Sequence, residues 1–221
     1  MIVTLSRQAG CGGDLIAARV AAALGVVLVD RSYIYAAALT AGVPEDLLHK
    51  LMYEGERSLA AHIMDTLTGR PASLSLHTSP AHPLSGIFAP MLQMPSITQE
   101  EGVHTVGLVI KGVASRENVL VLGQGAQHVL RGDPGVCHVL VVAPYDVRVQ
   151  RVADAEKVTV AVARRRVRAS DLARDEYLAR YHGVNWLDPY QYHLVINTGQ
   201  TSVDVAVSLI VHAAQEIGRG A

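Results

Sequence analysis

The sequence has few cysteines, almost no net charge and no long apolar stretch. Cys11 and Cys137 are two cysteines far apart in 221 residues, so we expect no disulfide framework and a reducing, cytoplasmic environment. The formal net charge of −1 argues against a broadly basic surface for a nucleic-acid polymer. No apolar run approaches the roughly 18 residues that span a bilayer, and no basic segment precedes the first apolar run. We therefore expect neither a membrane span nor an export signal.

Half of the residues are apolar, which is enough to build one substantial core. Short apolar runs typical of strands alternate with segments of helical periodicity. Strands are expected at residues 2–5, 26–29, 118–122, 136–143 and 194–197, and the longer helices at 15–24, 32–40, 44–67, 97–115, 158–181 and 203–217. This alternation predicts a single α/β domain over residues 1–221, with a parallel, doubly wound sheet of about five strands.

The first strand and helix are joined by a glycine-rich turn at residues 6–13. Gly10, Gly12 and Gly13 have no Cβ atoms, so the backbone can bend sharply and direct several N–H groups into one concavity at a helix N-terminus. Arg7 lies close enough to add a positive charge. The pattern predicts a site for a phosphate group; the alternative is an ordinary βα turn of a parallel sheet.

Polar residues also follow two later strands, at the sheet edge where α/β proteins bind ligands. Asp30 and Arg31 come after the second strand and either face that edge or cap the next helix. Gly123 and Gln124 follow the third strand. The Gly-x-Gly pattern there is a poor dinucleotide fingerprint, because His128 stands where the third glycine belongs.

Residues 68–96 lose all periodicity and contain five prolines. A segment this long is usually a lid, a partner surface or disordered. His77 and His82 lie within it, but two histidines without a nearby acidic or thiolate partner are weak evidence for a metal, so we expect no protein-bound metal.

Residues 158–181 are rich in arginine. Such a run is most often a solvated helix face, but beside a phosphate loop its arginines become candidates for closing over phosphates. The candidates here are Arg164, Arg168 and Arg174, with Asp171 between them, and Arg148 and Arg151 on the preceding helix.

Five blocks in order resemble the cytidylate kinase-like family of nucleoside monophosphate kinases, which has a P-loop fold. They are SRQAGCGG, LVDRSYI, NVLVLGQGAQHVL, HVLVVAPYDVRVQRV and SDLARDEYLARYHGVNWLDPYQYHLVINT. The resemblance covers most of the chain outside about 54–100.

The resemblance implies phosphoryl transfer from ATP with Mg²⁺ to a pyrimidine nucleoside monophosphate such as CMP or dCMP. Ser6, Arg7, Gly10, Cys11, Gly12 and Gly13 would form the donor-phosphate loop. Asp30, Arg31, Gly123 and Gln124 would face the acceptor. Arg7, Arg168, Asp171 and Arg174 would be catalytic, and Arg148, Arg151 and Arg164 would add phosphate contacts from a lid at about 155–185.

The sequence departs from the expected pattern in two places. A full Walker loop has Gly-Lys-Ser/Thr at the helix start, whereas this chain has Gly13, Asp14 and Leu15, so the lysine and the hydroxyl are missing. The family generally has glycine for that lysine but a basic residue next, so Asp14 reverses a charge. The family also usually has arginine where Gln124 stands, and losing a charge-assisted contact typically costs roughly 1.5–3 kcal/mol of binding.

Three hypotheses follow. The protein is a cytidylate-type kinase, or a catalytically impaired protein that binds nucleotides or phosphate on the same scaffold and has a regulatory role, or a helix-mediated interaction module. The inserted segment at about 44–115 would be an acceptor-side or partner segment and could join two copies of the chain.

Overall fold

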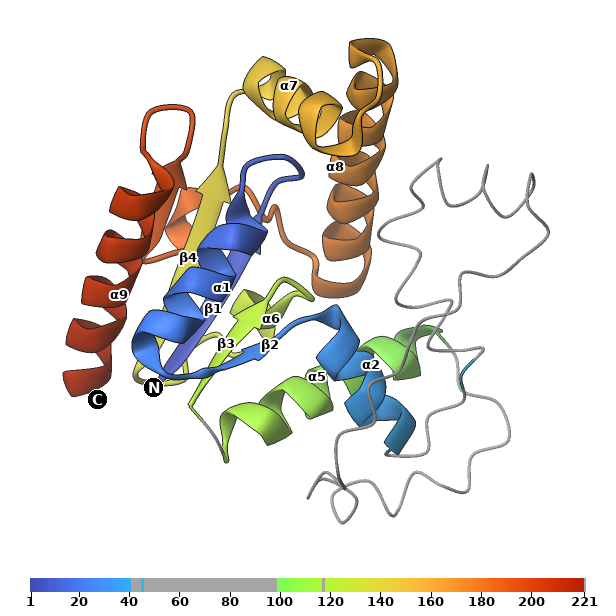
Figure 1. The fold of residues 1–221 in the computed structure, drawn as a ribbon. Helices are drawn as coiled ribbons and strands as arrows, with labels where there is room; N and C mark the ends of the chain where they lie inside the picture. Colours follow the sequence, from blue (N-terminus) through green and yellow to red (C-terminus); the bar gives the residue numbers. More distant parts are fainter. Residues whose placement is uncertain (41–44, 46–98, 117, 221) are drawn as a thin grey trace.

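The computed structural model describes residues 1–40, 45, 99–116 and 118–220 (Figure 1). The expected helix at 44–67, the irregular segment at 68–96 and the two histidines within it lie outside these residues. The strands are β1 (Ile2–Arg7), β2 (Val27–Val29), β3 (Val119–Leu122), β4 (Val136–Val142) and β5 (Leu194–Asn197). The helices are α1 (Gly13–Leu24), α2 (Arg31–Thr40), α5 (Gln99–Ala114), α6 (Ala126–Val129), α7 (Tyr145–Glu156), α8 (Val160–His182) and α9 (Val203–Arg219), with a 3₁₀ turn η3 (Pro189–Gln191).

All five strands are parallel, in the order β2-β3-β1-β4-β5. The chain starts in the central strand β1, moves outward to β2, returns through β3, and then crosses to the other side of β1 to form β4 and β5. In such sheets, ligands collect beyond the carboxyl ends of the strands where the order reverses. The predicted α/β, P-loop NTPase-like architecture is confirmed.

Helices cover both faces of the sheet (Figure 1). On one face, α1 and α9 bury Ile16 and Ile210 against Val3 and Leu5 of β1. On the other face, a second cluster joins α2, α5 and α6 to β2 and β3. Because both faces of the central strands are covered, β3 is a continuous apolar run and β4 is apolar except for the buried His138.

The helical pair α7 and α8 lies beyond the carboxyl end of β4 (Figure 1). Thr159 starts α8 by accepting a hydrogen bond from the N–H of Val162, and Gly183 ends it with a φ of 63°. The helix therefore falls within the range of about 155–185 that was expected to form a lid.

The expected boundaries differ most in β1 and α6. Ser6 and Arg7 were assigned to the turn, but they continue β1 because they pair with Leu140 and Val141 of β4. The short helix α6 was not predicted, since four residues are too few for a periodic signal.

Candidate phosphate-transfer site

The loop between β1 and α1 leaves amide groups of the helix start without a protein acceptor. Gly12 is the N-cap, with a φ of 83° and no side-chain cap. The first hydrogen bond of α1 runs from the N–H of Ile16 to the oxygen of Gly12 at 3.1 Å. No described residue accepts a hydrogen bond from the N–H of Asp14 or Leu15. Such amides at a helix N-terminus suit an anion.

The other side of the loop is fastened to the protein. A Cβ atom on Gly10 would lie 2.6 Å from the oxygen of Arg148, so only glycine lets the loop pack against α7. The oxygen of Cys11 accepts from the Thr198 hydroxyl at 2.6 Å and from Arg151 at 3.3 Å. Burial raises the pKa of the Cys11 thiol, so it stays neutral and acts as a small core side chain.

The side chain of Arg7 passes between two glycine turns. A Cβ atom on Gly13 would lie 2.5 Å from the Cβ of Arg7, and one on Gly123 would lie 2.5 Å from its Nη1. The guanidinium also contacts Oδ1 of Asp14, at 3.0 Å from Nη2 and 3.3 Å from Nε. The Asp14 side chain is 73% exposed, whereas that of Arg7 is 18% exposed. The carboxylate thus pairs with Arg7 from the solvent side.

A cavity of about 50 Å³ opens beside Arg7 at the carboxyl ends of β1 and β3. Three arginines line it: Arg7 from β1, Arg31 from α2 and Arg174 from α8. Of the described residues that line the cavity, none is an aspartate or a glutamate. The lining is Ser6, Arg7, Arg31, Gly123, Gln124, Gly125, Gln127, Arg174, Tyr177, Leu178 and Trp186.

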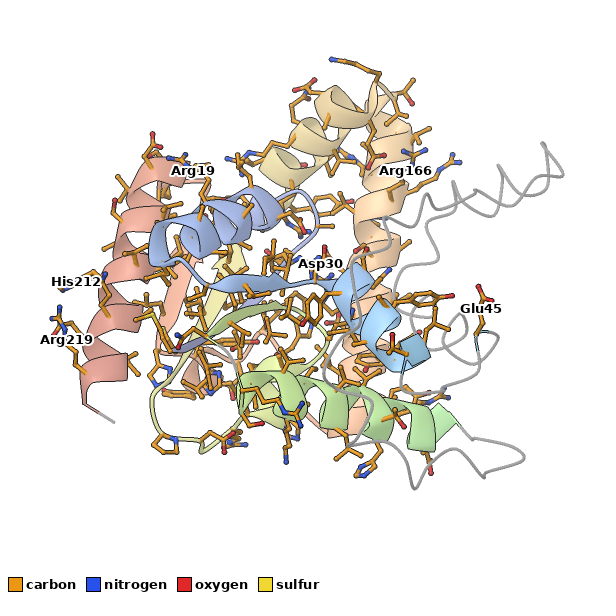
Figure 2. The ribbon with its side chains drawn as sticks, turned by 60° about the horizontal axis from the view of Figure 1, so that its bottom comes forward. Arg19, Asp30, Glu45, Arg166, His212 and Arg219 are labelled. Carbon is orange, nitrogen blue, oxygen red and sulfur yellow. The ribbon has the colours of Figure 1, made fainter. Side chains whose placement is uncertain are left out.

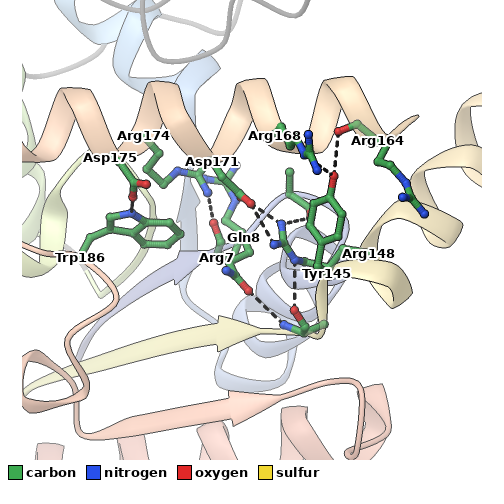
Figure 3. A network of polar contacts seen from close by, with 12 residues as sticks. Arg7, Gln8, Tyr145, Arg148, Arg164, Arg168, Asp171, Arg174, Asp175 and Trp186 are labelled. Carbon is green, nitrogen blue, oxygen red and sulfur yellow. Dashed lines mark hydrogen bonds and ion pairs between the residues drawn. The ribbon is translucent and has the colours of Figure 1, made fainter. Parts of the chain in front are cut away.

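Arg174 is positioned by contacts on both sides (Figure 3). Its Nη1 donates to the backbone oxygen of Arg7, and its Cζ lies 5.1 Å from the centre of the Trp186 ring. Trp186 is 1% exposed, and its ring N–H donates to the carboxylate of Asp175. This arrangement directs an arginine of α8 to the end of β1, where the glycine-rich loop begins.

A comparison with known proteins fits this geometry. The profile of the Cytidylate kinase-like family matches residues 2–200. The chain belongs to this family. It is also 28% identical over 90 residues to a cytidylate kinase from Methanothermobacter thermautotrophicus, a match that takes in 41% of this chain and 54% of that relative. The match therefore spans about half of the relative's length.

A solved structure shows the same fold over nearly the whole chain. An uncharacterized protein from Eubacterium ventriosum superimposes with a TM-score of 0.63 at 17% identity, covering 97% of this chain and 98% of that one. A shikimate kinase from Acinetobacter baumannii gives a TM-score of 0.44 at 15% identity, with coverage of 97% and 93%.

No helix within the described residues is both long and apolar enough to cross a membrane.

The arginines expected to form the family's phosphate contacts divide into two groups. Arg148 is 4% exposed and makes a bidentate pair with Asp171, at 3.0 and 2.9 Å. It also donates to the oxygens of Ala143 and Ala9, so it bridges α7, α8 and the loop (Figure 3). Arg151 donates to the hydroxyl and to the backbone oxygen of Thr198. These two arginines hold the scaffold and do not line the cavity.

Two further arginines of α8 also lie away from the cavity. Arg164 is 3.7 Å from Asp146, and both side chains are more than half exposed. Arg168 donates to the hydroxyl of Tyr145 at 3.1 Å (Figure 3). Arg174 is therefore the α8 arginine that reaches the cavity, out of the candidates from the sequence.

On the acceptor side, Asp30 and Arg31 have different roles. The carboxylate of Asp30 accepts from the N–H of Tyr33 at 2.9 Å, so Asp30 caps α2, and it is not among the residues that line the cavity (Figure 2). Arg31 does line it. Gln124 also lines the cavity, and its φ of 57° is unusual for a residue other than glycine.

Sequence patterns alone assign no functional role to Gln127, Tyr177 or Trp186. Gln127 accepts from the Ser6 hydroxyl at 3.1 Å and is 3% exposed. Burial raises the pKa of Tyr177 to about 12, so it stays neutral. Trp186 and Tyr177 both lie in the last of the five resembling blocks, which is the signal that could have identified them. The charged residues that line the cavity are therefore its three arginines.

Proposed function

We propose that the protein transfers the terminal phosphoryl group of ATP to a pyrimidine nucleoside monophosphate. The convergence of Arg7, Arg31 and Arg174 from three elements on one cavity beside the loop amides carries this proposal. Phosphoryl transfer depends mainly on positioning and on neutralising charge, and such a cluster supplies both. A cavity of about 50 Å³ fits phosphoryl groups and leaves the two nucleosides to adjoining surfaces.

The donor phosphates would bind the amides at the start of α1, with Arg7 between them and the acceptor turn. Arg174 would neutralise charge on the transferred group, because its contacts with Trp186 and with the backbone of Arg7 direct it there. Arg31 and Gln124 would bind the acceptor phosphate. Gln124 donates hydrogen bonds without charge, so Arg31 would carry the ionic part of that contact.

Mg²⁺ would arrive with the nucleotide and would supply further charge neutralisation. The described residues contain no cluster of three or more His, Cys, Asp or Glu side chains that could hold a metal ion. Asp14 is the carboxylate of the loop and could add one oxygen ligand.

A nucleotide-binding protein without turnover is the second candidate. The contact of Asp14 with Arg7 favours it, because a phosphate must compete with this carboxylate for the arginine. The two candidates are separated by measuring ADP formation from Mg-ATP with CMP, dCMP or UMP, together with calorimetric titration of ADP. Turnover with one of the acceptors supports the kinase. ADP binding without any turnover supports the second candidate, and no binding contradicts both.

A further inference from the structure

The structure fixes how this loop aligns with a Walker loop. The motif reads Gly-x-x-x-x-Gly-Lys-Ser/Thr between a strand and a helix. Here α1 begins at Gly13, directly after the left-handed Gly12. Gly12 is therefore the second glycine, Gly13 stands in the lysine's place, and Arg7 stands where the motif has its first glycine. This corrects the comparison made from the sequence, which set Asp14 against the lysine. Compared with the motif, the chain lacks the cation at position 13 and has one six residues earlier.

The two positions touch each other, so the two changes depend on one another. A Cβ atom at Gly13 would lie 2.5 Å from the Cβ of Arg7 and 2.8 Å from its Cγ. Carbon atoms that are not bonded prefer about 3.5–4.0 Å. Only one of the two residues can therefore carry a side chain in this backbone arrangement, and a lysine at position 13 is excluded while Arg7 is present.

The charge of Arg7 reaches the place where donor and acceptor must meet. Its Nη1 lies against Gly123 on the acceptor turn, while the start of its side chain lies over Gly13 on the donor loop. A guanidinium presents several N–H groups in a planar fork, which can bind two phosphate oxygens at once. Nε and Nη2 of Arg7 both donate to Oδ1 of Asp14, and a phosphate oxygen could accept the same two hydrogen bonds.

We propose that Arg7 replaces the Walker lysine, reaching the nucleotide phosphates from the first position of the loop, and that Asp14 is its exchange partner when no phosphate is bound. This inference rests on the proposed nucleotide binding. It assigns the phosphate-binding charge to one residue and explains why position 13 is glycine.

The test moves the cation back to its usual position. Arg7→Gly, Gly13→Lys and the double variant Arg7→Gly/Gly13→Lys are compared with wild type by calorimetric titration of ADP. Arg7→Gly is expected to lose about ten- to a hundredfold in affinity, the usual effect of removing a charge-assisted contact. Gly13→Lys alone should also bind weakly and melt at a lower temperature, because its side chain collides with Arg7. The double variant should regain most of the affinity lost by Arg7→Gly.

Controls separate the possible failures. Arg19 lies further along α1 and pairs with the exposed Asp204 of α9, so Arg19→Ala should bind ADP like wild type (Figure 2). Circular dichroism and melting curves show which variants are folded. Unchanged ADP affinity in folded Arg7→Gly, or no recovery in a folded double variant, overturns this inference and leaves the proposed function standing. Wild-type protein that binds neither ADP nor ATP overturns both.

Discussion

Two arginine–aspartate pairs flank the phosphate loop, and they differ in almost every respect but composition. Arg148 and Asp171 form a bidentate pair whose side chains are 5% and 26% exposed, and Arg148 also bonds two backbone oxygens. Arg7 contacts a single oxygen of Asp14, whose side chain is 73% exposed. The first pair is built into the scaffold, while the second is open to solvent, as the proposed exchange with a phosphate requires. Pairing and burial thus distinguish Arg148, a structural arginine, from Arg7, the arginine that we propose binds phosphate.

The largest effect is expected from breaking the buried pair. Arg148→Ala should lower the free energy of unfolding by about 3 kcal/mol, because it leaves Asp171 without its partner and removes two backbone contacts. Urea denaturation measures this loss. Arg164→Ala is the matched control, since its pair with Asp146 is exposed and should contribute less than about 1 kcal/mol. Equal losses in the two variants would contradict the distinction between buried and exposed pairs.

Arg174→Ala should separate catalysis from stability. We expect turnover to fall about a hundredfold, the typical loss when one group that stabilises transition-state charge is removed. The melting temperature should change little. Steady-state ADP formation measures the first effect, and a thermal melt followed by circular dichroism measures the second. Turnover close to that of wild type would remove Arg174 from the mechanism.

Asp14→Asn tests the exchangeable pair. Without the carboxylate, Arg7 is available to phosphate at all times, so ADP should bind about fivefold more tightly when Mg²⁺ is absent. Stability should change little because the pair is exposed. Calorimetry with a metal chelator present gives the affinity. Weaker binding under these conditions would show that Asp14 supports the nucleotide site instead of competing for Arg7.

Neither pair should dominate the response to mild acid, which we assign to two buried histidines. Burial, together with the neighbouring His193, lowers the pKa of His138 to about 4, while Asp133 opposes the shift. Burial, together with the neighbouring His128, likewise lowers the pKa of His182 to about 4. The unfolded chain, with a histidine pKa near 6.5, binds the proton more readily. Stability should therefore be complete above about pH 6.5 and fall as the pH drops toward 4.

Urea denaturation at several pH values measures this dependence. His138→Asn should reduce the slope of this curve between about pH 6.5 and 4 by roughly half, because His182 contributes a similar share. The same change at His212 on the surface of α9 should leave the slope unchanged (Figure 2). A curve that keeps its slope in His138→Asn would assign the acid response to other groups.

The architecture could be predicted from the sequence because it depends on local patterns. Apolar runs and helical spacing located the strands and most described helices, and the glycines at 10, 12 and 13 located the loop. The partners of the arginines depend on side chains far apart in the sequence, and no local pattern records them. In the sequence, Arg148 resembles a phosphate ligand. In the structure it forms a bidentate pair with Asp171, which lies 23 residues away in the chain.

The crowding of Arg7 and Gly13 could not be inferred from the sequence either. The sequence shows Arg7 and Gly13 as two separate features of the loop. Their dependence on each other follows only from the short distance between their Cβ positions in the folded structure. Likewise, the sequence leaves open whether the adjacent residues Asp30 and Arg31 cap α2 or face the sheet edge. Only the direction of each side chain separates them.

A crystal structure of the protein with ADP tests the central claim most directly. We predict a phosphate within about 3 Å of the guanidinium of Arg7 and of the amides of Asp14 and Leu15, with the carboxylate of Asp14 released from the arginine. ADP phosphates bound elsewhere, with Arg7 still paired to Asp14, would contradict the account.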